Sequence, residues 1–177
     1  MDINRLANRR HKKTEYTPLY TPAERRRRDA SRWTLVQGVL AQLQFVVFLV
    51  SLFLVMRYLI TGDGLFAATL SVVVKTLVLY TIMITGSIWE KEVFGQYLFA
   101  RSFFWEDVVS MLVLALHTAY LVAVMGGFLS PRGQMVLALA AYASYLINAG
   151  QFLWKLRTAR AQRPEQVCAP GAAGATE

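Results

Sequence analysis

Residues 89–107 bring acidic, basic and aromatic side chains together between two apolar runs. The stretch reads WEKEVFGQYLFARSFFWED. Such a mixture suits a large, flat, mostly apolar ligand that offers a few reactive or polar points, so this is where we expect chemistry. An aromatic belt at a membrane surface is the alternative interpretation, because Trp and Tyr rings gather there whatever a protein does.

A second set of polar side chains is embedded inside four apolar runs: Gln42 and Gln44, Lys75, His117, and Asn148. Counted at about 1.5 Å per residue, each lies roughly 12 to 20 Å in from the end of its run, near the middle of a membrane. Polar and ionisable groups at that depth are costly and normally face a bundle interior, so we expect a shared polar pocket.

Hydrogen bonding between helices is the alternative for the histidine and the amides in this set. Lys75 is different, because an amine at that depth requires a partner or an aqueous cavity. Glu106 and His117 are eleven positions apart, close to three helical turns, so both should lie on one face of a helix.

Four transmembrane helices are the elements that must position these residues. The chain of 177 residues is 55% hydrophobic, with a mean hydropathy of +0.38, which is too apolar for an ordinary soluble domain. Residues 35–60, 65–88, 108–128 and 134–156 form runs that match the roughly 20 residues needed to cross a hydrocarbon core. We therefore expect an all-α polytopic membrane protein, a four-helix bundle over residues 34–156 with an aromatic and acidic cytoplasmic loop between its second and third helices.

The two ends of the chain read differently from the bundle. Residues 1–33 form a basic cytoplasmic segment in which Thr21, Pro22 and Glu24 have the order of a helix start, so we expect a short interfacial helix there. Residues 157–177 have the composition of a disordered cytoplasmic tail. The single cysteine, Cys168, excludes a disulfide within the chain.

Lys and Arg are distributed unevenly along the chain. Sixteen of the nineteen lie in residues 1–33, 89–107 and 155–163, and only Arg57 and Arg132 lie in the other two turns. By the positive-inside rule, both termini face the cytoplasm. The run of four arginines at 25–28 predicts contact with anionic membrane lipid rather than with nucleic acid, since no stacking platform or groove-binding motif accompanies it.

Three long strings of the sequence carry a resemblance to a known family. They read YTPAERRRRDASRWTLVQGVLAQLQFVVFLVSL, TIMITGSIWEKEVFGQYLFA and FFWEDVVSMLVLALHTAYL. The chain, from about Tyr20 to Leu156, resembles the vinyl-bacteriochlorophyllide hydratase family, small membrane enzymes of bacteriochlorophyll synthesis in phototrophic bacteria. The resemblance implies addition of water across the C3-vinyl group of a chlorophyllide, without a redox cofactor, in the bacterial inner (intracytoplasmic) membrane. The partners that it implies are a chlorophyllide-type tetrapyrrole, membrane lipid and other pigment-synthesis enzymes.

For that substrate, proton delivery to the terminal vinyl carbon followed by addition of water requires an acid and a base. We expect Glu90 or Glu106 to be the acid, and Asp107 or Glu106 to be the base. Acids that merely stabilise a helix N-terminus are the alternative for Glu106 and Asp107. His117 would ligate the magnesium of the substrate or hydrogen-bond its ring, while the protein needs no metal of its own.

The remaining contacts to the substrate are expected from polar and aromatic side chains. Lys75 or Arg101 would meet the propionate carboxylate. The other candidates are Gln44, Trp89, Gln96, Tyr97, Trp105 and Asn148. The alternative function is a non-catalytic tetrapyrrole-binding membrane carrier or photosystem assembly factor. A proton-coupled exporter is a weaker alternative, because none of the four apolar runs contains an acid.

Overall fold

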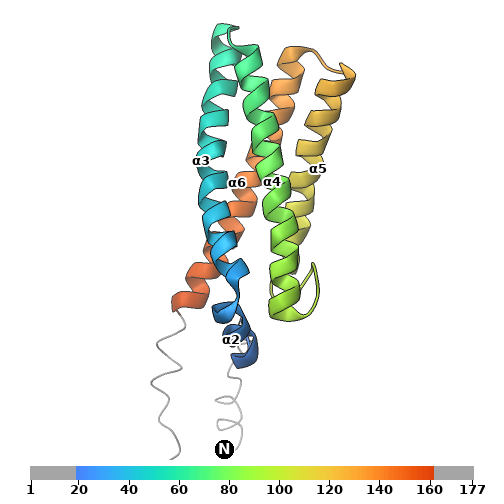
Figure 1. Cartoon of the computed structure of the whole chain (residues 1–177). Coiled ribbons are helices and arrows are strands. Elements are labelled where there is room, and N and C mark those ends of the chain that lie inside the picture. Colours follow the sequence, from blue (N-terminus) through green and yellow to red (C-terminus); the bar gives the residue numbers. More distant parts are fainter. Residues whose placement is uncertain (1–18, 162–177) are drawn as a thin grey trace, which may run out of the picture.

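The computed structural model describes residues 19–161, and in that part of the chain all the regular structure is helical. The helices, labelled as in Figure 1, are α2 (Pro22–Ala30), α3 (Arg32–Thr61), α4 (Leu65–Phe94), α5 (Phe104–Gly126) and α6 (Pro131–Ala161). The last four are long and apolar enough to cross a membrane. The predicted all-α, four-span architecture is therefore confirmed.

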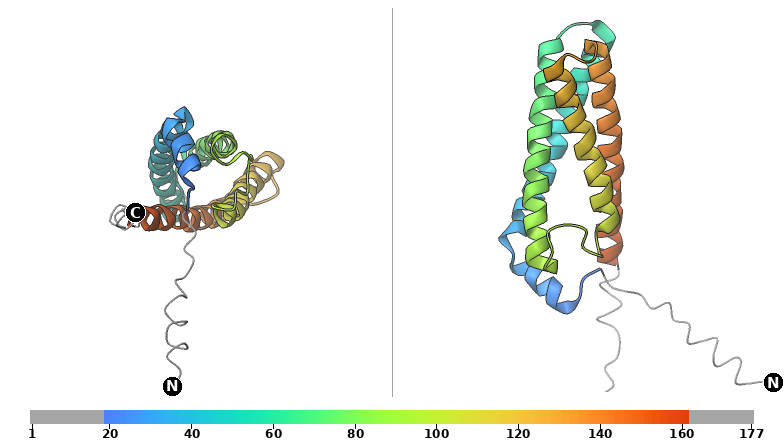
Figure 2. Two further views of the ribbon diagram at one scale, coloured as in Figure 1. Left: turned by 90° about the horizontal axis from the view of Figure 1, so that it is seen from below. Right: turned by 90° about the vertical axis from the view of Figure 1, so that its right-hand side faces the viewer.

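The four long helices form two antiparallel hairpins that stand side by side (Figure 1). α3 packs along α4, and α5 packs along α6. Contacts between the hairpins are fewer: α3 meets α6, while α4 touches α5 and α6 only sparingly. The view along the bundle in Figure 2 shows the four helices arranged around a common interior.

Glycines shape the connections within the two hairpins. Gly62 and Gly64, in the turn between α3 and α4, have φ of 80° and 85°, and Gly127, which ends α5, has φ of 63°. This left-handed region is readily available only to glycine. Helix α6 begins at Pro131, because proline fits the first position of a helix, where no backbone donor is needed.

Helix α2 and residues 95–103 lie at one end of the bundle, together with the last turns of α6 (Figure 1); we call this the basic end. Thr21 caps α2 as predicted: its hydroxyl accepts a hydrogen bond from Glu24 N, and the Glu24 carboxylate accepts one from Thr21 N. α6 extends through Ala161, five residues into the segment that the sequence assigned to a disordered tail. Residues 1–18 and 162–177, which include Cys168, lie outside the described part.

The connection between α4 and α5 is shorter than predicted. Trp89 and Glu90 belong to α4, which ends at Gly95 with φ of 87°, and Glu106 and Asp107 lie in the first turn of α5. Helix α4 continues beyond its apolar run because Glu90 and Val93 are buried against neighbouring elements. The acids are thus held on helix ends, where their positions are better defined than on a free loop.

The outward surface of the four helices is strongly apolar. Its large exposed side chains include Phe53, Ile60, Phe66, Met125 and Trp154. The interior, by contrast, mixes aromatic and aliphatic side chains with buried polar ones. That distribution is the one expected of a bundle whose solvent is lipid, since apolar side chains need not be hidden from a bilayer.

Candidate functional site

Three helices each bury a polar side chain in the interior of the bundle. Lys75 of α4 and His117 of α5 are fully buried, with 0% exposure, and Gln44 of α3 is 2% exposed. We call these three the interior group. Each has at least one polar atom without a hydrogen-bond partner among the residues described: both atoms of the Gln44 amide, Lys75 Nζ and His117 Nε2. Buried polar atoms are nearly always paired, so a set of three unpaired groups indicates a place for a polar ligand.

The tautomer of His117 follows from its one hydrogen bond. Its Nδ1 lies 2.8 Å from the backbone oxygen of Val113. A carbonyl only accepts, so Nδ1 must carry the hydrogen, and the neutral ring then presents a bare lone pair at Nε2. Metal-binding histidines are typically oriented in this way, with the second nitrogen donating to a carbonyl or carboxylate.

The Lys75 amine rests against an aromatic ring instead of an acid. Its Nζ lies 3.8 Å from the centre of the Tyr145 ring. It is also close enough to His117 for the two groups to interact electrostatically. A cation over a tyrosine face is attracted by the electron-rich ring, but this is weaker than a carboxylate partner and leaves the hydrogen-bond donors of the amine free.

Aromatic rings from α3 and α6 link the members of the interior group. Phe48 contacts both Tyr142 and Tyr145, with ring centres 5.4 and 5.1 Å apart, and the His117 ring lies 6.0 Å from that of Tyr142. The Tyr142 hydroxyl is fixed by a 2.5 Å hydrogen bond with Ser51. The wall of the interior is therefore aromatic, which is suitable for stacking against a flat ligand.

The carboxyl groups at the basic end have protein partners. Asp107 accepts a hydrogen bond from Phe99 N at 2.8 Å, and Glu90 accepts a longer one from Ala100 N at 3.4 Å. The two carboxyls also lie within hydrogen-bonding reach of each other. Because two carboxylates have no hydrogen to share, such a contact requires one proton between them. Phe99 has a positive φ of 60°, a backbone conformation unusual for a side chain of this size, so the acids hold a strained part of residues 95–103.

Glu106 is engaged in an ion pair with α6. Its Oε2 lies 2.6 Å from Lys155 Nζ, and the lysine also lies over the Phe103 ring. An open groove of about 480 Å³ runs beside this pair, and it is lined by Glu106, Gly150, Gln151, Trp154, Lys155 and Thr158. The carboxylate of Glu106 is thus held by a cation of the protein itself.

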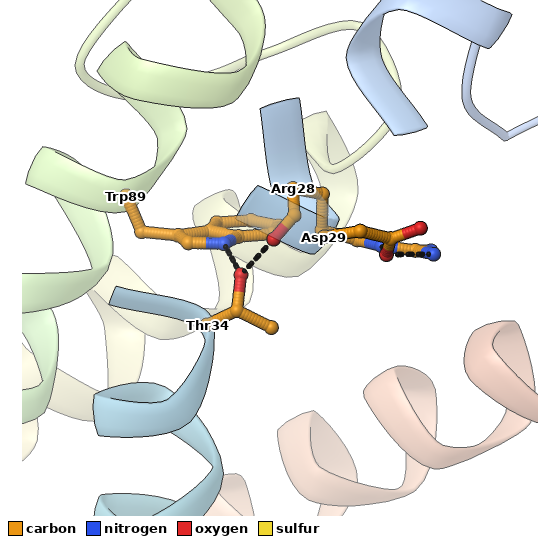
Figure 3. Close-up of polar contacts among 4 residues, drawn as sticks. All are labelled: Arg28, Asp29, Thr34 and Trp89. Atoms are coloured by element: carbon orange, nitrogen blue, oxygen red, sulfur yellow. Dashed lines mark hydrogen bonds and ion pairs between the residues drawn. The ribbon is translucent and has the colours of Figure 1, made fainter. Parts of the chain in front are cut away.

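The aromatic side chains of residues 89–107 separate into two sets. Trp89, Phe94 and Phe103 pack against one another and against Tyr20 of the N-terminal segment and Phe152 of α6. The Trp89 indole also donates to Thr34, whose hydroxyl in turn donates to the backbone oxygen of Arg28 (Figure 3). Trp89 therefore joins α4 to the junction between α2 and α3.

The outer set of these side chains is exposed at the basic end. It comprises Gln96, Tyr97, Phe99, Arg101, Phe104 and Trp105. Trp105 is 70% exposed and Tyr97 is 56% exposed. These groups are free to meet a membrane surface or a ligand, whereas Trp89 is occupied within the protein.

The predicted site residues thus lie at two levels of the bundle. His117 follows Asp107 by ten residues on α5, and Lys75 precedes Glu90 by fifteen residues on α4. At about 1.5 Å per residue, the acids are about 15 Å from His117 and about 22 Å from Lys75 along the helix axes. The prediction that His117 is buried on the same face of α5 as Glu106 is confirmed.

Comparison with known proteins agrees with the resemblance seen in the sequence. The family described as 2-vinyl bacteriochlorophyllide hydratase (BCHF) matches residues 20–158. The chain belongs to this family. It is 68% identical over 143 residues to the 2-vinyl bacteriochlorophyllide hydratase of Cereibacter sphaeroides, covering 80% of this chain and 88% of the relative. It is 67% identical over 145 residues to that of Rhodobacter capsulatus, covering 81% and 84%. No solved structure matches the chain significantly.

The amides of Gln42 and Asn148 have different surroundings in this hydratase-family chain. Gln42 is exposed on the outside of α3, so the prediction that it shares the interior pocket is wrong; it lies two residues from Gln44 and therefore on another face. Asn148 donates a 2.8 Å hydrogen bond to Ser110 and so joins α6 to α5, while its oxygen has no partner within residues 19–161. The alternative of hydrogen bonding between helices thus holds for Asn148.

Several residues of the site were not foreseen from the sequence. Those on α6 are Tyr142, Tyr145, Gln151 and Lys155, and those on α3 are Phe48 and Ser51. On α6 the polar and aromatic positions 142, 145, 148, 151 and 155 recur every three or four residues. That helical period was the available sign that α6 presents a polar stripe to the interior.

Proposed function

We propose that this chain adds water to the vinyl group of a bacteriochlorophyllide-type substrate, giving a hydroxyethyl group, as the names of its relatives state for those proteins. The observation that carries the site assignment is His117. Its buried Nε2 lone pair faces the interior, and its Nδ1 hydrogen is held by Val113. A neutral imidazole in that arrangement is suited to be an axial ligand for the magnesium of the substrate.

The charges of the protein favour one orientation of such a substrate. A propionate carboxylate is best accommodated at the basic end, where Arg101 is exposed and close to the surface. A carboxylate in the middle of a membrane would instead be costly. With the magnesium at His117 and the propionate toward the basic end, the flat ring lies against Tyr142, Tyr145 and Phe48, and Gln44 can hydrogen-bond its edge.

The route into this site lies between the two hairpins. α4 makes few contacts with α5, whereas each helix packs extensively against the partner in its own hairpin. Separation of α4 from α5 would expose Lys75 and His117 to a planar ligand that arrives from the bilayer. Substrates with a large apolar surface are concentrated there by partition into lipid.

In this pose the acids Glu90, Glu106 and Asp107 lie too far from the vinyl group to transfer a proton to it. The distance of about 15 Å along α5 from Asp107 to His117 is longer than the reach from the centre of a tetrapyrrole to its vinyl group. The predicted proton transfer by these acids and the predicted magnesium ligation by His117 therefore exclude each other in a single pose. We assign Glu90 and Asp107 to holding residues 95–103, and Glu106 to the ion pair with Lys155.

Water addition changes no oxidation level, so the reaction itself calls for no redox cofactor. Water can approach the interior through buried polar atoms that have no partner in the described chain, on Gln151 and Asn148 of α6 and on Gln44 of α3. Buried groups of this kind commonly bind water. These atoms mark a polar line from the groove beside Glu106 to the interior group.

The proposed location is the bacterial inner membrane, with both termini and the basic end facing the cytoplasm. The arginines of α2 support contact with anionic lipid, because cationic side chains beside a helix bundle are attracted to an acidic membrane surface. Enzymes that supply the vinyl substrate or consume the hydroxyethyl product are the further partners proposed.

The proposed function is tested with the purified full-length protein in lipid nanodiscs. Incubation with a vinyl chlorophyllide should yield a pigment heavier by one water, detected by mass spectrometry, and protein denatured by heat should yield none. Binding of pigment without the mass gain would contradict the hydratase assignment and establish the carrier alternative.

A further inference from the structure

We propose that Lys75 is the catalytic acid and base of the hydration, an inference that rests on the proposed function. Lys75 is fully buried, and its amine has only the Tyr145 ring for a close neighbour of complementary charge. The described residues offer Nζ no hydrogen-bond acceptor. An ammonium held in this way keeps all of its donors for a ligand.

The position of Lys75 relative to His117 supports this role. Lys75 Nζ lies 3.8 Å from the Tyr145 ring, and the His117 ring lies 6.0 Å from that of Tyr142, one helical turn away on α6, so the amine and the imidazole lie beside the same aromatic wall. A ring centred at His117 and stacked against this wall therefore presents one edge to Lys75. The vinyl group stands on a different pyrrole ring from the propionate, so it can lie at this edge while the propionate points toward the basic end.

No carboxyl competes with Lys75 at that depth. All acids of α4 and α5 lie at the basic end, and neither α3 nor the transmembrane part of α6 contains one. The other groups around this edge are tyrosine hydroxyls and the Ser51 hydroxyl, which are neutral and would leave an anion behind on giving up a proton. An ammonium becomes neutral when it gives up a proton, so Lys75 is the interior group of the described chain best suited to donate one while the lone pair of His117 holds the magnesium.

The reaction balances with Lys75 alone. The ammonium transfers one proton to the terminal vinyl carbon, the carbon–carbon double bond supplies the electron pair for the new bond, and the cation on the inner carbon is stabilised by the conjugated macrocycle. Water then bonds to that inner carbon and loses one proton to the neutral amine. The product carries one hydroxyethyl group, and the lysine regains its starting charge. No oxidant, reductant or further proton is consumed.

Removal of the Lys75 amine distinguishes a role in proton transfer from a role in anchoring the propionate, because the first affects turnover and the second affects pigment affinity. If the amine supplies the proton, the Lys75→Met variant keeps pigment affinity and loses rate. If the amine binds the propionate, the same variant loses affinity. Methionine matches the length of the lysine stem and is a good helix former, and it removes a buried amine without a polar partner, so the variant should fold.

The experiment compares Lys75→Met with Lys91→Met in full-length protein in nanodiscs. Lys91 is a matched control, because it lies on the same helix and its Nζ also rests on a tyrosine ring, 4.1 Å from the centre of Tyr97, but at the exposed basic end. Turnover of a vinyl chlorophyllide is followed by mass, and pigment affinity is followed separately by absorbance titration. Lys75→Met should lower turnover by about 10²- to 10⁴-fold, the range for loss of a general acid, with pigment affinity changed less than about threefold. Lys91→Met should match the unmodified protein in both.

Chemical rescue adds a readout that a structural role would not give. In Lys75→Ala, a small primary amine supplied in the buffer should restore turnover in proportion to its concentration, whereas an equally sized alcohol should not. Lys75→Met turnover within about threefold of normal, or affinity lost in parallel with turnover, would overturn the inference. If the unmodified protein itself adds no water, the proposed function fails instead, and the two failures are thus distinguishable.

Discussion

The buried carboxyl groups at the basic end of the bundle have protein partners, whereas each member of the interior group has a polar atom that lacks one among residues 19–161. At the basic end, Glu106 pairs with Lys155, and Glu90 and Asp107 receive backbone N–H groups. In the interior, Lys75 and His117 are buried more completely, yet each retains a polar atom without a partner in residues 19–161. A paired acid is accounted for by the structure of the protein, whereas an unpaired buried base costs stability and so indicates a ligand.

This difference changes which residues are the best candidates for chemistry. The acids were the conspicuous group in the sequence because they stand among aromatic rings. The structure gives those acids and Trp89 partners within the fold. The interior group, spread over three helices and more than seventy positions of sequence, has the free lone pair and the free ammonium donors. Variants in the two regions should therefore fail in different ways.

The largest effect is expected from His117→Ala. Loss of the Nε2 ligand should lower the affinity for the magnesium-containing pigment by more than about 100-fold, the upper range seen for residues that merely support a metal ligand. Hydration should fall accordingly at low pigment concentration. Absorbance titration and the mass assay measure the two effects, and added imidazole should restore part of the affinity. Unchanged affinity would remove His117 from the site.

A smaller effect is expected from Asp107→Ala at the basic end. The variant frees the Phe99 N–H and releases residues 95–103, so trypsin should cleave after the exposed Arg101 about tenfold faster, as expected for loss of a charge-assisted hydrogen bond worth about 1.5 kcal/mol. Glu92→Ala is the control, because the hydrogen bond that Glu92 accepts comes from Ser31, which lies outside these residues.

The turnover of Glu90→Gln tests whether the basic end or the interior group transfers the proton. The amide still accepts a hydrogen bond from Ala100 N, so turnover should stay within about tenfold of normal. If Glu90 were the acid, as the sequence predicted, turnover should instead fall by about 10²- to 10⁴-fold. A loss in that range would contradict the assignment of proton transfer to the interior group.

The ion pair at the basic end should behave as a structural element. Glu106→Ala leaves the partly buried Lys155 without its carboxylate, and we expect a loss of about 1 to 2 kcal/mol in the free energy of unfolding, reduced by the partial exposure of the lysine. The double variant Glu106→Ala/Lys155→Ala should lose less than the sum of the two single changes. Chemical denaturation in detergent micelles provides the measurement, and strict additivity would show that the pair contributes nothing.

The smallest effect has the opposite sign. Gln44→Met replaces an amide without partners by an apolar side chain of similar size, so the pigment-free protein should be as stable as before or gain up to about 1 kcal/mol. Gln42→Met, on the exposed side of the same helix, is the matched control and should change pigment affinity little. A clear loss of stability in Gln44→Met would show that the amide has partners in the free protein.

Much of the architecture could be predicted because the bilayer imposes it. Apolar runs of sufficient length define α3 to α6, and counting residues inward placed Lys75 and His117 in the interior, where both are fully buried. The start of α2 could be predicted from the capping residues Thr21 and Glu24 alone. These predictions depend on length, hydropathy and spacing within one helix, which are all properties of a continuous segment.

The rest depends on contacts between segments that are distant in sequence. Lys155 reaches Glu106 across 49 positions, and Trp89 reaches Thr34 across 55. No local sequence pattern predicts these partners, so the acids and Trp89 were predicted to bind or act on a ligand. The outward direction of Gln42 also depends on which face of α3 meets α4, and a helix that is apolar on nearly every side does not reveal this.

The central claim is that the lone pair of His117 recognises the metal of the substrate, and it is tested most directly by removing that metal. Affinities of the unmodified protein and of His117→Ala should be measured for a vinyl chlorophyllide and for its magnesium-free form. The account predicts that the unmodified protein strongly prefers the magnesium form and that His117→Ala binds both forms equally weakly. Equal binding of the two pigments by the unmodified protein, or the same preference in the variant, would contradict it.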